Sequence, residues 1–95
     1  MTSSKKPLYD LEDRTTQFAK GIRRLVKRLK KTIANIEDSK QLIKSSGSVG
    51  ANYREANEAL SKKDFALRIK ICRKEAKESA YWLDLLDTEN DQQIE

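Results

Sequence analysis

The side chains best suited to chemistry in this sequence are cations in one short stretch, and no acid falls between Phe18 and Lys31. Helical spacing places these cations on the side of a helix opposite an apolar stripe. Like charges recur four residues apart, and such pairs repel each other. Because an anionic partner would relieve this repulsion, the pattern predicts contacts with the phosphates of a nucleic acid. The residues predicted to make these contacts are Lys20, Arg23, Arg24, Lys27, Arg28 and Lys31.

The composition of this basic face limits how it could read a nucleic acid. No aromatic side chain lies among the basic residues, so bases are not expected to stack on the face. The expected mode is electrostatic contact with phosphates without sequence readout, and RNA is the expected nucleic acid. The alternative interpretation is a solvated surface that binds nothing.

Catalytic and metal-binding residue types are scarce. The chain has no histidine and one cysteine, which leaves almost no ligand set for a transition metal. Glu75 and Glu78 alternate with Lys74 and Lys77, a pattern typical of a salt-bridged helix surface. No phosphate-binding glycine loop or serine elbow is present. We therefore expect no enzyme activity, no cofactor and no small-molecule substrate.

Length and charge describe one small domain with a basic first third. Residues 1–34 hold ten basic and three acidic residues, a net charge of +7, whereas residues 35–60 and 61–95 each carry a net charge of −1. Residues 1–95 are too few for a second core. No apolar run is long enough to span a membrane, and the polar start from Met1 to Pro7 differs from a secretory signal. With Cys72 alone, a cytoplasmic protein is expected.

Three helices must position the basic face. The first is predicted over residues 10–31, with Leu11, Phe18, Ile22, Leu25 and Leu29 forming its apolar stripe. Acids follow Asp10 and cations precede the end, which suits the helix dipole. Residues 1–9 and 88–95 have no such pattern and are expected to be flexible.

The second predicted helix, residues 36–60, contains a run that first resembles a loop. Two glycines and three serines lie between Ser45 and Gly50. One stripe nevertheless passes through them at helical spacing: Leu42, Ser46, Val49, Tyr53, Ala56 and Leu60. Two glycines inside a helix cost about 1 kcal/mol each against alanine, so a packing reason is expected. We predict close helix packing at Ser46, Gly47, Gly50 and Tyr53, with Asn35 capping the helix.

The third helix, predicted over residues 62–87 with Ser61 as its cap, has two apolar faces. Its core stripe is Phe65, Ile69, Cys72, Ala76, Ser79, Leu83 and Leu86. Nearly opposite lie Leu67, Ile71, Trp82 and Leu85, which predict an interface with another helix or another subunit. The alternative for Trp82 is a half-buried side chain within a single bundle.

The glycine-containing run and several segments of the third helix resemble a bacterial family. The resemblance rests on Ser45-Ser46-Gly47-Ser48-Val49-Gly50-Ala51-Asn52-Tyr53, on Glu55-Ala56, Lys62-Lys63-Asp64-Phe65 and Arg68-Ile69, and on Lys74-Glu75-Ala76-Lys77-Glu78 and Tyr81-Trp82-Leu83. Over about residues 10–86 the chain resembles the four-helix-bundle 23S rRNA intervening-sequence proteins. That family is similar to the accessory protein of diversity-generating retroelements.

The resemblance implies an antiparallel up-down bundle, a continuous second helix and no catalytic residues. It also implies that ring-like homopentamers can form, and the similar retroelement accessory protein binds nucleic acid through a basic surface. Family members continue past the position of Leu86 into a fourth apolar helix, and no such stripe follows Leu86 here. The expected fold is therefore an all-α bundle with three helices and the fourth missing. Two functions remain open: a nucleic-acid-binding oligomeric scaffold, and a protein-interaction module without a nucleic-acid role.

Overall fold

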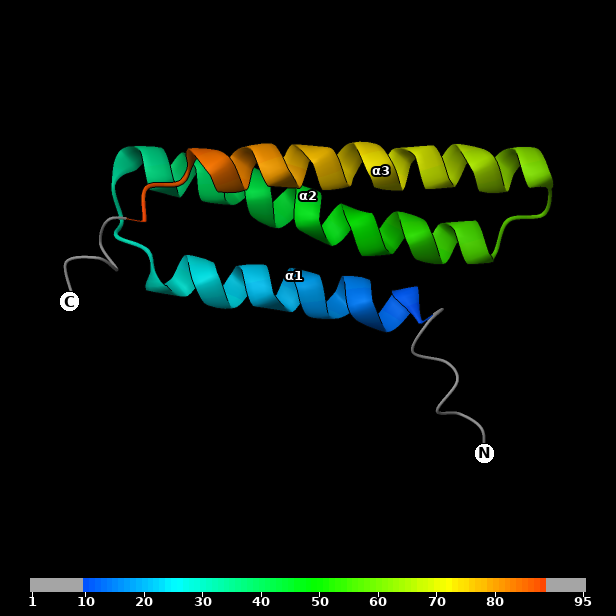
Figure 1. Ribbon diagram of the computed structural model, residues 1–95, viewed down its shortest axis with the longest axis horizontal. Helices are drawn as coiled ribbons and strands as arrows, with labels where there is room; N and C mark the ends of the chain where they lie inside the picture. The colour runs from blue at the N-terminus through cyan, green and yellow to red at the C-terminus, as the bar shows by residue number, and fades with distance from the viewer. Residues whose placement is uncertain (1–9, 89–95) are drawn as a thin grey trace, which may run out of the picture.

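Three helices form an up-down bundle in the computed structural model, which describes residues 10–88. They are α1 (Leu11–Arg28), α2 (Ile33–Asn57) and α3 (Lys62–Leu85). The middle helix α2 runs antiparallel to both neighbours and packs against each of them (Figure 1). No strand occurs among the described residues. The prediction of an all-α bundle with three helices is confirmed.

The first helix begins where its sequence predicts. The Asp10 carboxylate accepts a hydrogen bond of 3.2 Å from the backbone N–H of Asp13, which caps the helix. The predicted end at residue 31 is wrong, because α1 stops at Arg28 and Leu29 adopts an extended backbone. Lys30 and Lys31 therefore lie in the connection to α2 and do not continue the helical row of cations.

The start of α2 also differs from the prediction. Thr32 caps this helix, accepting a hydrogen bond of 3.0 Å from the backbone N–H of Asn35. Asn35 lies in the first turn and is only 2% exposed. Threonine and asparagine are both preferred as N-cap residues. Thr32 takes this position here, and the Asn35 side chain instead bonds to the backbone of Lys30 and Asp87.

Asn35 fastens three parts of the chain to one another. Its amide nitrogen donates hydrogen bonds of 3.0 Å to the carbonyl oxygens of Lys30 and Asp87. Its amide oxygen accepts a third bond, also of 3.0 Å, from the backbone N–H of Asp87. The connection after α1, the first turn of α2 and the residue following the end of α3 are thereby held together.

The glycine-containing run lies inside α2, which continues unbroken from Ile33 to Asn57. No glycine among the described residues has a positive φ, so the run needs no special backbone conformation. Gly50 is required for a different reason. A Cβ atom placed there would lie 2.9 Å from Oγ1 and 3.3 Å from Cβ of Thr15 on α1. A larger residue at this point would therefore have to displace Thr15 or push the two helices apart.

The second helix ends earlier than residue 60. Asn57 is its last residue, and the turn after it leaves Leu60 outside the helix with 99% of its surface exposed. The prediction that Leu60 extends the core stripe is therefore wrong. The other members of the stripe remain in α2, and Leu42, Ser46, Val49 and Ala56 are buried.

Small polar residues join α2 to α3. Ser61 caps α3, as predicted, through a hydrogen bond of 3.0 Å from the backbone N–H of Asp64. Halfway along the interface the hydroxyls of Ser45 and Ser79 lie 2.9 Å apart, and both residues are buried. Ser79 also donates to the carbonyl of Glu75 at 2.9 Å and Ser45 to the carbonyl of Leu42 at 3.3 Å, and either hydroxyl can be the donor of the pair.

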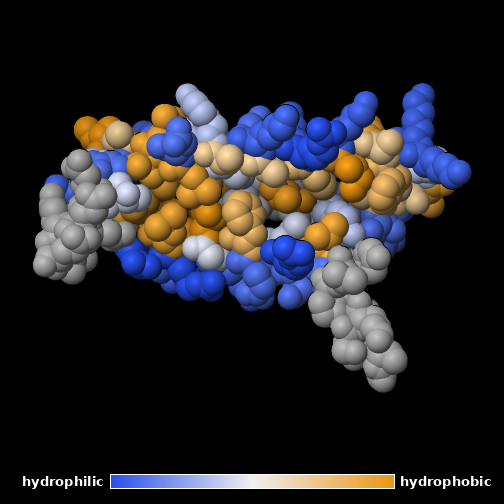
Figure 2. All heavy atoms as spheres, in the orientation of Figure 1, coloured by the Kyte–Doolittle hydropathy of each residue, from blue (hydrophilic) through white to orange (hydrophobic). Residues whose placement is uncertain are grey.

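The apolar core lies at the end where α1 and α3 finish. It consists of Ile22, Leu29, Leu42 and Leu86. Leu25, Val26, Trp82 and Leu83 pack against this core and are only partly buried. Figure 2 shows apolar surface gathered over this part of the molecule, between α1 and α3.

Part of the predicted core stripe of α3 is not buried. Phe65 is 45% exposed, and Ala76 is exposed as well. Among residues 10–88, α2 is the only helix that packs extensively against α3. Leu83 and Leu86 reach the core, whereas the stripe at Phe65 and Ala76 is open to solvent in the described part of the chain.

Candidate nucleic-acid interface

The predicted basic residues lie on the surface of α1 and of the connection after it. Lys20, Arg23, Arg24, Lys27 and Arg28 belong to α1, and Lys31 lies beyond its end. All six are exposed. Within residues 10–88 no ion pair involves Lys20, Arg23, Arg24, Lys27 or Lys31. These five charges are therefore not neutralised by the described part of the chain.

One edge of this face opens into a groove between α1 and α2. The groove has a volume of about 480 Å³, and Lys20 and Arg23 from α1 line it. Gly47 and Ala51 line it from α2. A Cβ atom at Gly47 would lie 3.6 Å from Nη2 of Arg23, so this guanidinium group extends over the glycine. The Nη1 atom of Arg23 also donates 3.1 Å to the carbonyl of Ala19, which orients the side chain.

A cation that the sequence did not single out completes the groove. Arg54 of α2 lines it opposite Lys20 and Arg23. Its Nη1 atom lies 3.1 Å from a carboxylate oxygen of Glu12, and its Nη2 atom donates 3.3 Å to the hydroxyl of Thr16. The other Glu12 oxygen accepts 2.8 Å from the amide of Asn57. Glu12 therefore holds Arg54 at one end of the basic face.

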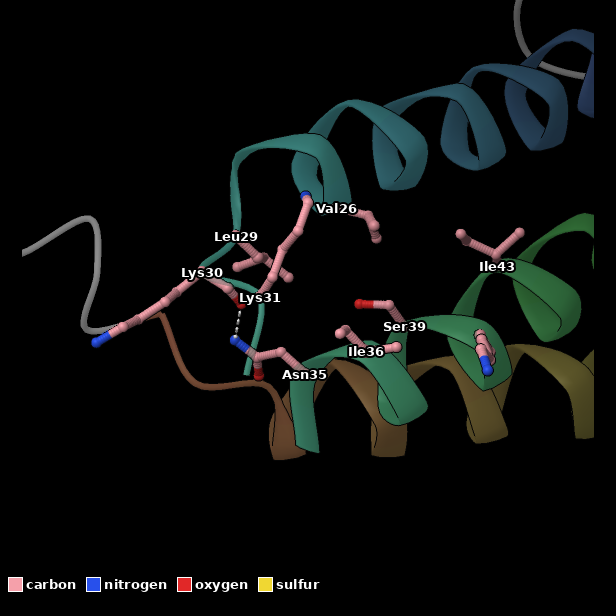
Figure 3. A pocket seen from close by; sticks show the side chains of 9 residues that line it. Val26, Leu29, Lys30, Lys31, Asn35, Ile36, Ser39 and Ile43 are labelled. Carbon is pink, nitrogen blue, oxygen red and sulfur yellow. Dashed lines mark hydrogen bonds between the residues drawn. The ribbon is translucent and has the colours of Figure 1, made fainter. Parts of the chain in front are cut away.

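The same seam between α1 and α2 forms a second, smaller cavity at its other end. Its volume is about 210 Å³, and it lies beside the end of α1 and the first turns of α2 (Figure 3). Lys30, Lys31 and Lys40 are among the residues that line it. Lys31 was predicted as part of the helical row and is placed instead at this cavity. Lys30 and Lys40 were not predicted as site residues.

A signal for the α2 cations does exist in the sequence. Lys40, Gly47 and Arg54 recur at intervals of seven residues, so they share one side of α2. Assigning them to the basic face requires knowing that this side flanks α1, and that register is set by the close approach of Gly50 to Thr15. Spacing along one helix does not contain this information.

The family described as 23S rRNA-intervening sequence protein matches residues 9–91. The chain belongs to this family. The resemblance found in the sequence is thereby confirmed.

A solved structure supports the same assignment for this family member. It is similar to a protein of unknown function from the S23 ribosomal protein family of Bacteroides thetaiotaomicron, with 41% sequence identity and a TM-score of 0.67. The match covers 78% of this chain and 68% of that chain. No match was found among proteins of curated function.

The residues predicted as an interface on α3 of this family member fall into two groups. Leu67 and Leu85 are 53% and 44% exposed, whereas Ile71 is half-buried. Trp82 is also half-buried, because one part of it packs against the core of this chain. Its ring lies edge-on to Tyr81, with 5.2 Å between the ring centroids. Leu67 and Leu85 are therefore the exposed apolar members of the set.

The four α2 residues predicted to allow close helix packing differ in how deeply they are buried. Ser46 is fully buried, and its hydroxyl donates 3.2 Å to the carbonyl of Ile43. Gly50 touches Thr15, and Tyr53 is half-buried. Gly47 has more room, because an added Cβ would meet only the end of the Arg23 side chain.

The described part of the chain contains neither a cluster of metal ligands nor a helix that could span a membrane. Residues 10–88 contain no group of three or more histidine, cysteine, aspartate or glutamate side chains able to hold a metal ion. None of α1, α2 and α3 combines the length and the apolar character needed to cross a bilayer.

Proposed function

We propose that this protein binds nucleic acid, with RNA as its expected ligand, through phosphate contacts made by the basic face of α1 and without catalysis. The observation that carries the proposal is the acid-free run from Lys20 to Lys31, whose cations are exposed. Family membership supports it, since the family takes its description from an intervening sequence of 23S rRNA. The single cysteine, free in this structure, suits a reducing cytoplasm, and we place the activity there.

The geometry favours phosphates over bases on this face. The cations follow one side of α1, and no aromatic side chain lies among them there. Guanidinium and ammonium groups in such a row neutralise successive phosphates and release the counterions condensed on them. This mode of binding is strong at low salt and carries little sequence preference.

Salt dependence of binding tests the proposal. We would measure the fluorescence anisotropy of a labelled structured RNA against the full-length protein over a range of KCl concentrations. Each lost phosphate contact lowers the slope of log K against log salt by about 0.7–0.9. Replacing Arg23, Arg24, Lys27 and Arg28 by glutamine should therefore weaken binding strongly and flatten the slope.

A matched variant separates this face from net charge. Lys62, Lys63, Lys70 and Lys77 are exposed lysines of α3, and replacing them by glutamine removes the same charge elsewhere. The α3 variant should keep most of the affinity and slope. Equal losses in both variants, or unchanged binding in the α1 variant, would show that the basic face is not the binding surface.

A second candidate function is protein–protein association through α3, including assembly of several copies of this chain. The observation that favours it is the exposed apolar surface of α3, where Leu67, Tyr81 and Leu85 are 44–57% exposed. Exposed apolar side chains gathered on one helix are typical of an interaction surface. A closed ring, such as a pentamer, would also multiply weak phosphate contacts into one strong binding surface.

Sedimentation velocity over a wide range of protein concentration tests this second candidate. The wild-type protein should form an oligomer, and Leu67→Gln with Leu85→Gln should shift it toward the monomer. The exposure of both leucines means that these substitutions remove little core packing. A wild-type protein that remains monomeric throughout contradicts the candidate.

A further inference from the structure

The smaller cavity in the seam between α1 and α2 has features that phosphate binding does not require. Its walls are the aliphatic side chains of Val26 and Leu29 from the end of α1 and of Ile36 and Ile43 from α2 (Figure 3). Ile36 is 42% exposed although it is apolar. No acidic residue occurs among the described residues that line the cavity. An apolar slot therefore lies directly beside a cluster of lysines.

Ser39 places one polar group in this slot. The residue is only 7% exposed, and Figure 3 shows its hydroxyl turned into the cavity. The other serines of α2 behave differently. Ser45, Ser46 and Ser48 each donate to a carbonyl three or four residues earlier in the helix, at 3.0–3.3 Å.

The Ser39 hydroxyl makes no hydrogen bond to any described residue. Its oxygen is not sealed from solvent, since residues 10–88 contain no fully enclosed side-chain oxygen or nitrogen without a partner. A helical serine normally satisfies its hydroxyl on its own helix, as its neighbours do. The Ser39 hydroxyl has no partner among the described residues and is therefore available to a ligand that carries a hydrogen-bonding group.

The cavity is held open by contacts that a ligand would not disturb. The Asn35 side chain, which lies at its edge, already donates to the carbonyls of Lys30 and Asp87 and accepts from the Asp87 N–H. These bonds fix the connection that carries Lys30 and Lys31. Asn35 is therefore a structural wall, and Ser39 is the polar group that remains available.

The lysines stand where a chain of phosphates could pass. Figure 3 shows Lys30 leading away from the cavity, whereas Lys31 extends along its opening. Lys40 lies on the α2 side and pairs with Glu37 at 3.4 Å, with both side chains about two-thirds exposed. An ion pair this exposed contributes little and can be exchanged for a phosphate.

We propose that this cavity receives one unstacked base of a single-stranded RNA. The base lies between the aliphatic walls, and its edge bonds to the Ser39 hydroxyl, which can donate or accept. Its backbone stays outside, with the flanking phosphates on Lys30, Lys31 and Lys40. The inference rests on the proposed function and adds to it a site for a base.

Size and chemistry both favour a base. Sites for drug-sized molecules measure about 300–1,000 Å³. The cavity, at about 210 Å³, is smaller than such sites, so it suits a single ring system better than a larger ligand. An aliphatic side chain from an acidic peptide would fill the same slot and leave the Ser39 hydroxyl without a partner, which is costly. A base brings hydrogen-bonding groups on its edge into the slot.

The test compares two single-stranded RNA decamers against the full-length protein by fluorescence anisotropy. One decamer carries mixed bases, and the other has the same backbone with every base replaced by an abasic ribose. The phosphates are identical, so the basic face binds both. We expect the decamer with bases to bind on the order of tenfold more tightly, as one hydrogen bond plus apolar contact would provide.

Substitutions in the cavity test whether it causes the difference in affinity between the two decamers. Ser39→Val removes the hydroxyl and fills the space, so it should bring the affinity for the decamer with bases down to that for the abasic decamer. Ser48→Val is the matched control in the same helix and should keep the difference. Ile36→Gln alters a partly exposed wall residue, so it tests the slot without depending on a change in the core.

The outcomes distinguish this inference from the proposed function. Equal affinity of the wild-type protein for both decamers, with binding still lost in the α1 glutamine variant, overturns the base site and leaves the basic face intact. A difference that survives both Ser39→Val and Ile36→Gln overturns it too. An acidic, leucine-containing peptide that binds the cavity tightly and is lost in Ser39→Val assigns the slot to a protein partner. If neither decamer binds while the labelled structured RNA still does, the base site fails and the proposed function stands. If the structured RNA is not bound either, both fail.

Discussion

Asn35 and Asp87 lie 52 positions apart and exchange two hydrogen bonds of 3.0 Å each. The exchange joins the first turn of α2 to the residue just beyond the last turn of α3. Since the Asn35 amide also bonds the carbonyl of Lys30, one buried side chain fixes the end of the bundle that carries the core and the smaller cavity.

Replacing Asn35 tests how much its three hydrogen bonds to Lys30 and Asp87, here called the Asn35 clasp, stabilise the bundle. Asn35→Ala leaves the Lys30 carbonyl and the Asp87 backbone groups without their partner. We expect the free energy of unfolding to fall by about 1–3 kcal/mol, measured by urea denaturation followed by circular dichroism. Asn52→Ala is the matched control, because the Asn52 amide donates only within its own helix, to Ser48 at 2.9 Å. Equal losses for the two variants would show that the clasp adds nothing special.

The two central glycines should respond differently to alanine. Gly47→Ala meets only the flexible end of Arg23, so it gains the helix propensity of alanine, about 1 kcal/mol. Gly50→Ala forces a Cβ atom to within 2.9 Å of the Thr15 hydroxyl, which is itself bonded to the carbonyl of Leu11 at 2.7 Å. Overpacking of this kind typically costs about 1–3 kcal/mol.

Thermal unfolding of both variants measures the difference. Gly47→Ala should melt above the wild-type protein and Gly50→Ala below Gly47→Ala. Combining Gly50→Ala with Thr15→Ala should recover part of the loss, because it removes the nearest atom. If Gly50→Ala is as stable as Gly47→Ala, then α1 and α2 are not held at this separation in solution.

The continuous second helix could be predicted from the sequence, whereas the contacts between helices could not. The stripe from Leu42 through Val49 to Ala56 depends only on spacing within one helix, and spacing is visible in the sequence. The role of Asn35 depends on Asp87, and the place of Arg54 depends on the register between α1 and α2. Both are contacts between distant segments, so neither could be predicted. Lys31 was misplaced because nothing in the Lys30-Lys31 pair marks Leu29 as the residue where the helix ends.

The buried serine pair between α2 and α3 should show coupling. Ser79→Ala removes the hydroxyl that Ser45 reaches at 2.9 Å, and we expect a loss of about 1 kcal/mol in unfolding free energy. Ser45→Ala should cost a similar amount. The double variant should cost clearly less than both losses added, because no buried hydroxyl is left without its partner. Strict additivity in a double-mutant cycle would mean that the two hydroxyls do not interact.

The thiol of Cys72 offers a readout that depends on pH. Burial raises its pKa above the ordinary 9.0, although a backbone hydrogen bond to the thiol opposes part of the rise. The folded protein therefore favours the neutral thiol, and this contribution to stability is lost as the pH rises through the raised pKa. Iodoacetamide should alkylate the folded chain more slowly than the urea-unfolded chain at every pH below that value. Because Cys72 is the sole cysteine, all of the signal belongs to it, and equal rates would contradict the raised pKa.

Glu12 should oppose nucleic-acid binding while it adds little to stability. It holds Arg54 through an ion pair at 3.1 Å, and the two side chains are 40% and 56% exposed. Pairs this exposed contribute about 0–1 kcal/mol, so Glu12→Gln should lower the unfolding free energy by no more than that. The glutamine can still accept the hydrogen bond from Asn57, and the substitution leaves the Arg54 charge free to meet a phosphate.

Binding measurements on this variant therefore probe the extent of the interface. Glu12→Gln should bind RNA more tightly at low salt, with a steeper salt dependence that reflects about one further phosphate contact. Asp84→Asn is the control, since it removes an exposed acid of α3 and changes the net charge equally. If the two substitutions raise the affinity alike, the effect belongs to net charge. If only Glu12→Gln does so, the interface includes the groove between α1 and α2 and extends to Arg54.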